Sequence, residues 1–392
     1  MSLRNNLSMK KIKVGYISPV NPKKDRMAWS GTYYNTFHAI RDAGAEVEWV
    51  SYNTQSIIYK LATKCASFLY KIAKGKGSST HSRVMSKVHS FFVNNQNLDK
   101  YDLLFIPGQI DIVAGLKARV PAIYYTDGTF NIMVDYYWFG YSKKAIDEGN
   151  KLERKAVKKS KFNFRSSHWA AESTVNDYGA NSKQTYIFPF GADVPQDCLL
   201  AQIPDYKSRT LKLLFSGKEW DRKGGRIAVA AAEYLNKAGI NTELYIVGPT
   251  VKPEYIEGKD FVKFIGYLDK NSASEYEKYL SLYHECSAFI LPTRAECAGL
   301  VFSEANAFGM PIFSSETGGI GDYVINGVNG YRLPLSATGE DFGKKIEEVY
   351  KEKAFDQLSN GAQETYKNST SWNAWSKHFK EFIEENFEQN GE

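Results

Sequence analysis

The first 190 residues alternate between short apolar runs and segments with helical periodicity. Residues 11–18 (KIKVGYIS) alternate in a β-rich pattern, and residues 32–43 place apolar side chains on one stripe of a helix. Gly44 ends that helix, and residues 47–51 form the next apolar run. This order predicts a βαβ unit with a right-handed crossover, and therefore a parallel sheet. Further strands are predicted at residues 103–107, 122–126, 162–165 and 186–188, with helices at 143–159 and 168–178.

A second series of the same kind begins at Leu211. Residues 211–216 (LKLLFS) predict a strand, and a polar turn joins it to an Ala-rich helix at 227–238. The segment between the two series contains two prolines and no periodicity, which is typical of a linker. Further strands are predicted at residues 243–247, 262–265 and 288–291. We therefore expect an α/β protein with two doubly wound, Rossmann-like domains at residues 10–192 and 210–370, joined by a linker at 193–209. An amphipathic C-terminal helix at residues 371–388 is expected to pack back onto the core. In such sheets ligands bind at the carboxyl ends of the strands, so we expect the site in a central cleft that the two domains face.

Length and composition agree with this division of the chain. A chain of 392 residues fits two or three domains, and 43% apolar and 24% charged residues are ordinary for a globular protein. No apolar run approaches the roughly 20 residues that span a bilayer, and the first residues lack the apolar region of a signal peptide. The four cysteines show neither CxxC pairing nor metal-site spacing. We therefore expect a cytoplasmic protein.

Charge is unevenly distributed between the two halves. Residues 1–200 contain 28 Lys and Arg against 16 Asp and Glu, whereas the remainder contains 22 against 28. No acidic residue occurs between Glu48 and Asp99, where apolar residues at 57, 61, 65, 68 and 72 form a helical stripe. One interpretation is a basic amphipathic helix that lies on an anionic membrane at its inner face. The other is a helical insert that buries its stripe in the core of the first domain.

Residues 215–225 (FSGKEWDRKGG) form the first candidate binding segment. The predicted strand ends at Gly217, the turn contains Lys218, Arg222 and Lys223, and two glycines precede the next helix. Backbone amides at a helix start, together with ammonium and guanidinium groups, suit a diphosphate. The P-loop pattern GxxxxGK[ST] is absent, and a solvated charged turn is the other interpretation.

Residues 294–311 (RAECAGLVFSEANAFGMP) form the second candidate segment. Gly299 allows a helix to begin close to a ligand, and the amino end of that helix attracts an anion. Glu296 would repel an anion, so it suits neutral hydroxyls beside a neutralised diphosphate. Glu304 lies inside the apolar helix, where a carboxylate is costly unless hydrogen-bonded, and a ribose diol is a suitable partner. Two ordinary glutamates at a helix start are the alternative.

Together these two segments resemble the retaining glycosyltransferases of family 4, which have the GT-B fold. The stretch ECAGLVFSEANAFGMPI matches the family signature E-x-F-G-L-x-x-x-E-A-x-A-x-G-x-P, in which two glutamates are separated by seven residues. SSETGGIGDYVINGVNGYRL, FSGKEWDRKGG and FPFGADVP resemble three further family segments. The resemblance covers residues 11–387 and is strongest at 211–334. It implies a hexosyltransferase that uses a nucleotide-diphospho-sugar, with an acceptor domain at residues 10–192 and a nucleotide-sugar-binding domain at 210–370.

The resemblance also implies roles for individual residues. Lys218 and Lys223 would hold the leaving diphosphate, and Glu296 would bind hydroxyls of the donor sugar. The first of these cations is usually an arginine in the family, and Lys lacks its two-point grip. Glu304 would hold the ribose. The remaining donor-binding residues implied are Gly31, Gly217, Arg222, Gly248, Tyr267, Leu268, Gly299, Leu300 and Val301.

One departure from the family concerns the end of the strand at residues 122–126. The family often has a histidine at this place, next to the reaction centre, whereas this chain has Asp127. A carboxylate there could orient the acceptor hydroxyl or take its proton. Because Asp-Gly is a common turn pair, Asp127 could also be a turn residue.

The expected function is therefore retaining, metal-independent transfer of a hexose, with UDP as the favoured nucleotide, to a glycan or a lipid-linked glycan. No Asp-x-Asp metal signature is present, and we expect no metal and no cofactor. Peripheral contact with an anionic membrane is a further expectation, and no nucleic-acid partner is expected. Two alternatives are a catalytically silent GT-B partner subunit, suggested by the missing histidine, and a nucleotide-sugar epimerase of similar fold.

Overall fold

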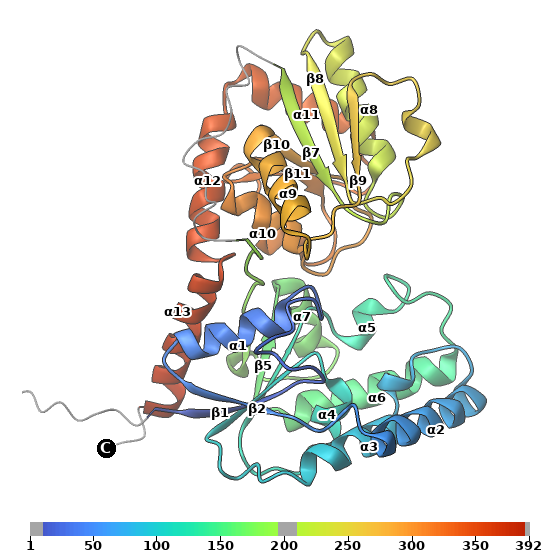
Figure 1. The fold of residues 1–392 in the computed structure, drawn as a ribbon, viewed down its shortest axis with the longest axis vertical. Coiled ribbons are helices and arrows are strands. Elements are labelled where there is room, and N and C mark those ends of the chain that lie inside the picture. The colour runs from blue at the N-terminus through green and yellow to red at the C-terminus, as the bar shows by residue number, and fades with distance from the viewer. Residues whose placement is uncertain (1–10, 195–209, 389–392) are drawn as a thin grey trace, which may run out of the picture. The chain divides into compact units, whose positions relative to one another are not determined.

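The computed structural model describes residues 11–194 and 210–388, which form two compact units (Figure 1). The first unit contains the chain up to Ser166, then Ala170–Phe188, and the chain from Ser376 onward. The second unit contains Ser167–Trp169 and Pro189–Trp375. The expected linker at 193–209 falls, from residue 195 on, outside the described residues.

The first unit is built on a parallel sheet. Within the described residues its six strands follow the order β2-β1-β3-β4-β5-β6, so the direction of winding reverses between β1 and β3. Val14 of β1 pairs with Leu103 of β3, and Ile106 of β3 pairs with Tyr124 of β4. The strands are β1 (Lys13–Ile17), β2 (Glu46–Val50), β3 (Leu103–Pro107), β4 (Ala122–Thr126), β5 (Phe162–Arg165) and β6 (Thr185–Ile187). Every strand predicted for this half of the sequence is present, to within two residues at each end.

Helices connect and cover these strands. They are α1 (Thr32–Asp42), α2 (Ile57–Lys74), α3 (Arg83–Asn94), α4 (Ile110–Gly115), α5 (Phe130–Met133), α6 (Lys143–Lys159) and α7 (His168–Asn176), with 3-10 turns η1 (Ser79–His81) and η2 (Ser182–Gln184). The last helix, α13 (Trp372–Ile383), begins in the second unit and ends in the first, where one π-turn, η6 (Glu384–Glu388), follows it. Phe382 packs edge-on against Phe162 and Phe164 of β5, with ring centres 4.9 and 5.0 Å away. The expectation of a C-terminal helix that packs back onto the core is confirmed.

The second unit contains another parallel sheet. Its six described strands follow the order β12-β11-β10-β7-β8-β9, which reverses between β7 and β10. The strands are β7 (Leu211–Ser216), β8 (Thr242–Val247), β9 (Val262–Gly266), β10 (Ala288–Leu291), β11 (Ile312–Ser315) and β12 (Gly330–Leu333). The helices are α8 (Gly225–Lys237), α9 (Ala273–Glu285), α10 (Leu300–Ala307), α11 (Gly339–Lys351) and α12 (Phe355–Asn368), with 3-10 turns η4 (Glu254–Ile256) and η5 (Gly318–Asp322). The α/β class and the two doubly wound sheets are therefore confirmed.

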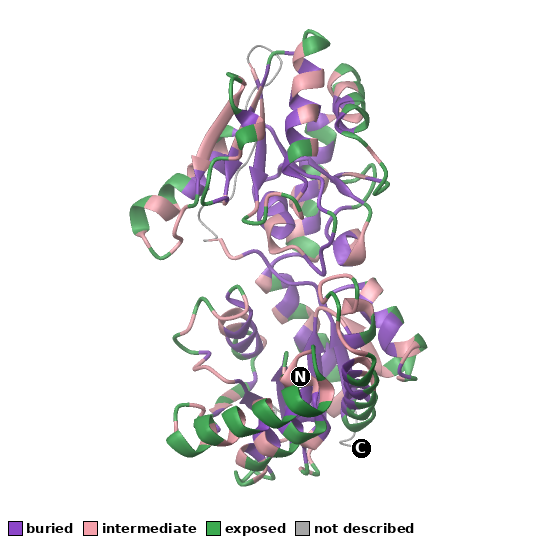
Figure 2. Ribbon diagram, turned by 90° about the vertical axis from the view of Figure 1, so that its right-hand side faces the viewer, coloured by how far each residue is buried: buried purple, intermediate pink, exposed green. Residues whose placement is uncertain are grey.

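The strands near the centre of each sheet are buried, but one long helix of the first unit is not (Figure 2). Of the residues in α2, only Ala66 and Tyr70 are buried. The apolar side chains Ile57, Leu61, Phe68 and Ile72 are all more than half exposed. The interpretation in which this stripe is buried in the core of the first domain is therefore wrong.

Candidate active site

The second sheet brings the two candidate segments to one point on its carboxyl edge. β7 and β10 pair directly, and the winding of the sheet reverses between them. In open parallel sheets this reversal creates the crevice in which ligands bind. Hydrogen bonds join the segment that follows β7 to the segment that follows β10: the Arg294 N–H donates to the Arg222 carbonyl at 2.7 Å, and Arg222 Nη1 donates to the Ala295 carbonyl at 2.8 Å. The topology thus assembles a single site from residues about 70 positions apart.

Two glycines allow the backbone turns at this edge to pack closely. Gly248, which follows β8, has φ +116°, and an added Cβ would lie 2.6 Å from the carbonyl carbon and oxygen of Gly217. A Cβ on Gly217 would in turn lie 2.9 Å from Cγ of Lys223. Side chains at either position would therefore displace the turn that presents Lys223. Tyr267 and Leu268 follow β9, and the ring of Tyr267 lies 4.6 Å from the Lys218 ammonium.

A buried ion pair lies where the two segments meet. Lys223 Nζ donates a hydrogen bond to Glu296 Oε2, and the two side chains are only 12% and 11% exposed. Arg222 Nη1 lies 3.7 Å from the same oxygen, and the guanidinium also makes a two-point contact with Glu219. Glu296 therefore lies among cations, next to the turn that is predicted to bind a diphosphate.

The amino end of α10 lies next to this ion pair. Gly299 is the N-cap residue with φ +74° and, being a glycine, provides no side-chain cap. A Cβ on Gly299 would lie 3.0 Å from Cγ of Glu296, so the glycine lets the two approach. The backbone N–H groups of Leu300 and Val301 belong to this first turn, where the helix dipole favours negative charge.

Glu304 lies one turn into α10 and is 2% exposed. Its Oε1 accepts a hydrogen bond from Lys270 at 2.6 Å, and its Oε2 accepts from the hydroxyls of Tyr279 at 2.6 Å and Tyr283 at 3.1 Å. Burial lowers the pKa of Lys270, but Glu304 and Tyr279 outweigh that effect, so the pKa of Lys270 is raised overall. Burial raises the pKa of Tyr279, which therefore stays a neutral donor. The Tyr279 hydroxyl also lies 3.3 Å from Ser216 Oγ, at the end of β7.

The sequence did not single out these partners of Glu304. Lys270 comes two residues after the predicted Leu268, and Tyr279 and Tyr283 have the i, i+4 spacing of one helix face. That spacing was the available signal. This spacing is common in core helices, however, so it did not identify the tyrosines as hydrogen-bond donors to a buried carboxylate.

A separate cavity of about 350 Å³ lies within the first unit. Its lining combines the aromatic residues Trp29, Tyr33, Tyr124, Phe130 and Trp138 with Asp127, Glu153, His81, Thr126, Gly108, Gly128, Ile110 and Met133. Trp29 and Tyr33 flank Gly31, which has φ +80° and precedes α1. Trp29 and Ser30 also adopt positive φ, of 50° and 53°, which costs an L-residue roughly 1–2 kcal/mol each. This strained loop and Asp127 at the end of β4 thus adjoin the same cavity.

Two buried titratable groups of this cavity were not predicted. Glu153 of α6 accepts a hydrogen bond from the Phe130 N–H at 3.2 Å through Oε2, whereas its Oε1 has no hydrogen-bond partner among the described residues. Burial raises the pKa of Glu153 to about 7, although the guanidinium of Arg165 opposes this. Burial lowers the pKa of His81 to about 4, and its Nδ1 also has no hydrogen-bond partner within the described chain. Because each is an isolated polar residue in an otherwise ordinary helical segment, no sequence pattern identifies either.

The predicted site residues therefore form two groups, one in each unit. Gly31 and Asp127 belong to the first unit, and Asp127 lines its cavity. All other predicted residues belong to the second unit and follow β7, β8, β9 or β10 or lie in the first two turns of α10: Gly217, Lys218, Arg222, Lys223, Gly248, Tyr267, Leu268, Glu296, Gly299, Leu300, Val301 and Glu304.

Comparison with known proteins agrees with this assembly. Residues 202–372 match the family described as glycosyl transferases group 1. This part of the chain is therefore similar in sequence to group 1 glycosyl transferases. It is 32% identical over 160 residues to glycogen synthase of Mycobacterium tuberculosis, in an alignment that covers 39% of this chain and 37% of that enzyme. The chain thus spans well under half the length of this curated relative, and the predicted resemblance to family 4 is confirmed.

Solved structures extend the structural similarity to both units of the chain. Sucrose-phosphate synthase from Thermosynechococcus elongatus has a TM-score of 0.66 at 16% identity, covering 97% of this chain and all of that one. Anabaena HepE, solved in complex with UDP and glucose, has a TM-score of 0.58 at 13% identity, covering 95% of this chain and all of that one. At these identities the likeness establishes the fold, and the predicted GT-B fold is confirmed.

Two features are absent from the described residues. No group of three or more His, Cys, Asp or Glu side chains could hold a metal ion there. No helix within that part of the chain is long and apolar enough to cross a membrane.

Proposed function

We propose that this chain is a retaining glycosyltransferase that moves a hexose from UDP-hexose to a glycan or a lipid-linked glycan. The observation that supports it best is the Lys223–Glu296 pair, held near the amino end of α10 and beside the Gly217–Gly248 turn. This arrangement places cations, helix amides and a carboxylate within one small region. A nucleotide-diphospho-sugar needs these same groups, because it is charged at the diphosphate and neutral at the sugar hydroxyls.

In this proposal each donor group has a partner in the second unit. Lys218 and Lys223 balance the charge that develops on the diphosphate as it leaves, and Arg222 supports them. The amides of Leu300 and Val301 donate hydrogen bonds to phosphate oxygens at the helix end. Glu296 accepts hydrogen bonds from hydroxyls of the sugar, and Glu304 accepts one from the ribose. Tyr267 and Leu268 flank the base.

The proposed reaction breaks the bond between the anomeric carbon and the β-phosphate oxygen. The acceptor oxygen forms its bond to the anomeric carbon on the face that the phosphate leaves, which retains the configuration. The acceptor proton passes to the departing phosphate oxygen or to Asp127. The lysines and helix amides stabilise the leaving group electrostatically, so the proposed transfer is independent of a metal ion.

The cavity of the first unit is the proposed acceptor site. Its aromatic walls suit the apolar faces of a sugar ring, and its carboxyl groups suit sugar hydroxyls. Glu153 Oε1 has no hydrogen-bond partner within the described part of the chain, and a sugar hydroxyl would supply one. Asp127 lies in the same lining and is the residue we propose to orient the acceptor hydroxyl.

The nucleotide is the first feature to test. A thermal-shift series with UDP-, GDP- and ADP-glucose measures binding directly, because a ligand at 100 times its Kd stabilises the folded state by about 2.7 kcal/mol. UDP-glucose is expected to raise the melting temperature most, as suggested by HepE, which was solved with UDP and glucose. An equal response to all three, or to none, would contradict the proposed donor.

Turnover is tested by release of UDP from UDP-hexose, with NMR of the transferred sugar to assign its anomeric configuration. Wild-type protein is expected to give the same configuration in product and donor, with or without EDTA. Glu296→Gln is expected to abolish turnover without loss of folding. Glu340→Gln, an exposed glutamate of α11, is the matched control and is expected to remain active. Donor binding without turnover under any acceptor would favour the silent partner subunit instead.

A further inference from the structure

The helix α2 leaves its apolar stripe exposed. The side that contacts the rest of the first unit carries the buried Ala66 and Tyr70 and the ring of Tyr59, which stacks on His89 with ring centres 5.0 Å apart. On the same side Thr63 Oγ1 lies 3.1 Å from His89 Nε2, and Ser67 Oγ lies 3.0 Å from Ser79 Oγ. The opposite side presents six large apolar residues with exposed fractions between 57% and 76%, namely Ile57, Ile58, Leu61, Phe68, Leu69 and Ile72. Hydrophobic packing therefore does not explain why this stripe exists.

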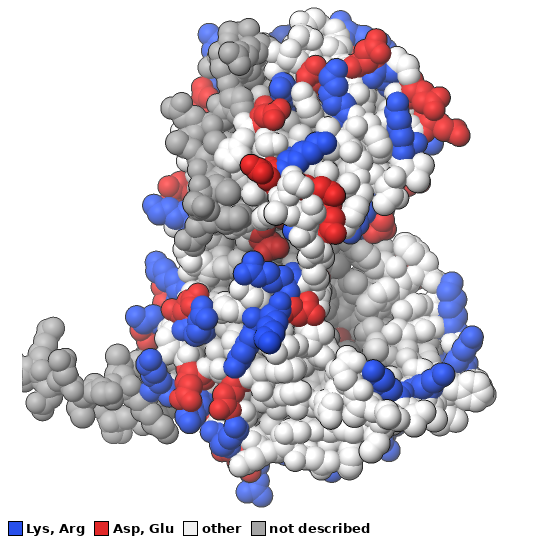
Figure 3. Space-filling view, viewed as in Figure 1, with Lys and Arg blue, Asp and Glu red and all other residues white. Residues whose placement is uncertain are grey.

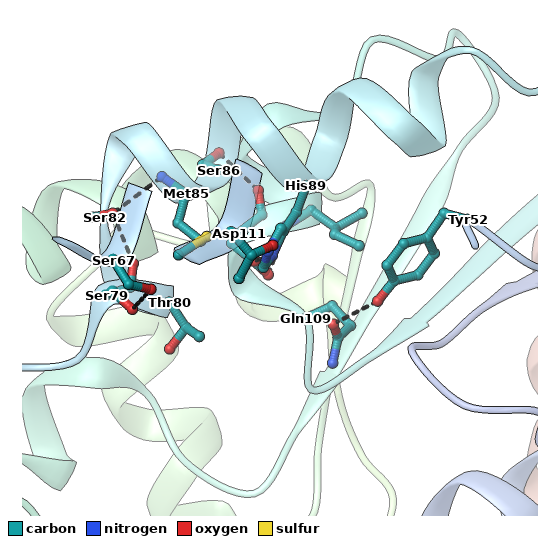
Figure 4. A network of polar contacts seen from close by, with 12 residues as sticks. Tyr52, Ser67, Ser79, Thr80, Ser82, Met85, Ser86, His89, Gln109 and Asp111 are labelled. Carbon is teal, nitrogen blue, oxygen red and sulfur yellow. Dashed lines mark hydrogen bonds and ion pairs between the residues drawn. The ribbon is translucent and has the colours of Figure 1, made fainter. Parts of the chain in front are cut away.

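A network of hydrogen bonds fixes α2 in this orientation (Figure 4). His89 of α3 bonds Thr63 on one side and Asp111 of α4 on the other, where Nδ1 lies 2.5 Å from Oδ2. Ser86 of α3 donates to the Asp111 carbonyl at 2.7 Å, so His89 and Ser86 both join α3 to Asp111. Rotating α2 to bury its stripe would break the bond to His89 and expose a buried imidazole–carboxylate pair.

Lysines follow one edge of the exposed stripe. At 3.6 residues per turn, Lys60, Lys64 and Lys71 fall on the same flank of the helix, beside Leu61 and Phe68. No ion pair involves these three lysines within the described chain, and no acidic residue occurs between Glu48 and Asp99. Figure 3 shows Lys and Arg atoms and no acidic atoms over the region that α2 occupies in Figure 1.

This combination of charge and apolar surface selects one kind of partner. A second copy of the chain would set these lysines against the same lysines, which is unfavourable. An anionic lipid surface attracts the lysines and also accepts the apolar side chains below its headgroups. An exposed apolar patch of this kind on a soluble helix marks an interaction site rather than ordinary surface.

We propose that α2 binds the surface of an anionic membrane, with its apolar stripe inserted among the acyl chains and its lysines at the headgroups. The helix has 18 residues with its apolar side chains on one face and lysines along its length, so it would lie in the plane of the interface rather than span the bilayer. This proposal does not depend on the proposed transfer reaction. The membrane proposal goes beyond the proposed reaction, because it names the surface on which the first unit would meet a lipid-linked acceptor.

The first experiment is flotation of the full-length chain with vesicles of phosphatidylcholine alone or with phosphatidylserine, across a series of salt concentrations. Binding is expected only with the anionic vesicles. Lys60→Gln, Lys64→Gln and Lys71→Gln in one protein are expected to weaken binding on the order of 100-fold, since each basic residue contributes roughly 1 kcal/mol at such a surface. The matched control replaces the exposed lysines Lys237, Lys367 and Lys377 by Gln and is expected to bind like wild type.

Salt separates insertion from simple charge attraction. The Debye length falls from about 30 Å at 0.01 M to about 8 Å at 0.15 M, so the electrostatic part of binding fades. Wild-type protein is expected to keep a salt-resistant fraction, which Leu61→Ser with Phe68→Ser removes. Both side chains are exposed, so the double variant is expected to keep the wild-type melting temperature, and Val251→Ser, an exposed position of the second unit, is the control.

The second experiment places the contact on α2 itself. Cys65 is exposed within the stripe, whereas Cys286 and Cys297 are buried, so a polarity-sensitive dye can be attached to Cys65 in a Cys198→Ser protein. The dye emission is expected to shift to shorter wavelength when anionic vesicles are added, and this readout requires no enzymatic activity. Absence of binding to anionic vesicles at low salt would overturn the proposal. Binding that none of the α2 variants weakens would also overturn it, as would self-association through the stripe without vesicle binding.

Discussion

Substitutions at Lys223 can distinguish its structural role from its proposed role in donor binding. Lys223 is the hydrogen-bond donor to a nearly buried Glu296, and it is also proposed to hold the diphosphate. Lys223→Met removes the charge but keeps most of the apolar stem, so packing changes little. Lys223→Met combined with Glu296→Gln removes both charges and leaves no unpaired carboxylate.

The structure gives different magnitudes for the two roles. In Lys223→Met the Glu296 carboxylate remains 11% exposed with Arg222 3.7 Å away as the remaining cation, so the free energy of unfolding is expected to fall by about 3 kcal/mol. The double variant is expected to recover to within about 1 kcal/mol of wild type, because no buried charge is left unpaired. Loss of a charge-assisted hydrogen bond to phosphate costs about 1.5–3 kcal/mol, which weakens UDP binding about 10- to 150-fold in both variants.

Urea unfolding and isothermal titration with UDP measure these quantities on the same samples. Stability is expected to recover in the double variant while UDP affinity does not. Lys237→Met, an exposed lysine on α8, is the matched control and is expected to change neither. If Lys223→Met bound UDP as tightly as wild type, the lysine would serve only the ion pair, and the proposed diphosphate contact would be refuted.

Three further predictions follow from single positions. Burial raises the pKa of Glu153 from 4.5 to about 7, so the native state binds more protons than the unfolded state between these pH values. The free energy of unfolding is therefore expected to decrease by roughly 3 kcal/mol as pH rises from 4.5 to 7. Urea unfolding of Glu153→Gln is expected to lack that decrease, and the same pH dependence in the variant as in wild type would contradict the raised pKa of Glu153. Gly248→Ala is expected to weaken UDP binding more than tenfold in calorimetry, because the added Cβ would collide with Gly217. Gly239 is also at positive φ but has open space around it. Gly239→Ala is therefore expected to keep UDP affinity and to lose only about 1 kcal/mol of stability. Wild-type protein is expected to bind UDP more tightly than its 2′,3′-dideoxy analogue, and Glu304→Gln is expected to reduce that preference; equal preference in both proteins would show that Glu304 does not contact the ribose.

The sheets could be predicted from the sequence because parallel strands are buried on both faces. Such strands appear as compact apolar runs, and the runs at 103–107, 122–126 and 211–216 coincide with β3, β4 and β7 to the residue. β11 and β12 were not predicted separately, because four-residue strands next to glycine-rich segments give little periodicity. The strand order, and with it the meeting of the turns after β7 and β10, depends on long-range pairing that no local pattern contains.

The environment of α2 shows a second limit of sequence patterns. The periodicity at 57, 61, 65, 68 and 72 predicted the helix correctly, but an amphipathic pattern does not say which face packs inward. Here Ala66 and Tyr70 are buried, and Thr63 forms a hydrogen bond with His89 of α3, so this side of the helix faces the unit. That choice depends on residues far along the chain, such as Asp111.

The candidate site divides in the same way. Glu296, Glu304 and the glycines were found because they form a spaced motif within one continuous segment. Lys270, Tyr279 and Glu153 were not found, because each is a single residue whose importance arises only from burial beside another polar group. Burial of this kind is a property of the folded chain.

A crystal structure of the full-length chain with UDP tests the central claim most directly. The account predicts the diphosphate at the amino end of α10, with phosphate oxygens within hydrogen-bond distance of Lys218, Lys223 and the amides of Leu300 and Val301. It also predicts that Lys223 Nζ shifts from Glu296 toward the phosphate, and that a ribose hydroxyl contacts Glu304. UDP bound elsewhere in the second unit, or bound with Lys223 still paired only to Glu296, would contradict the account.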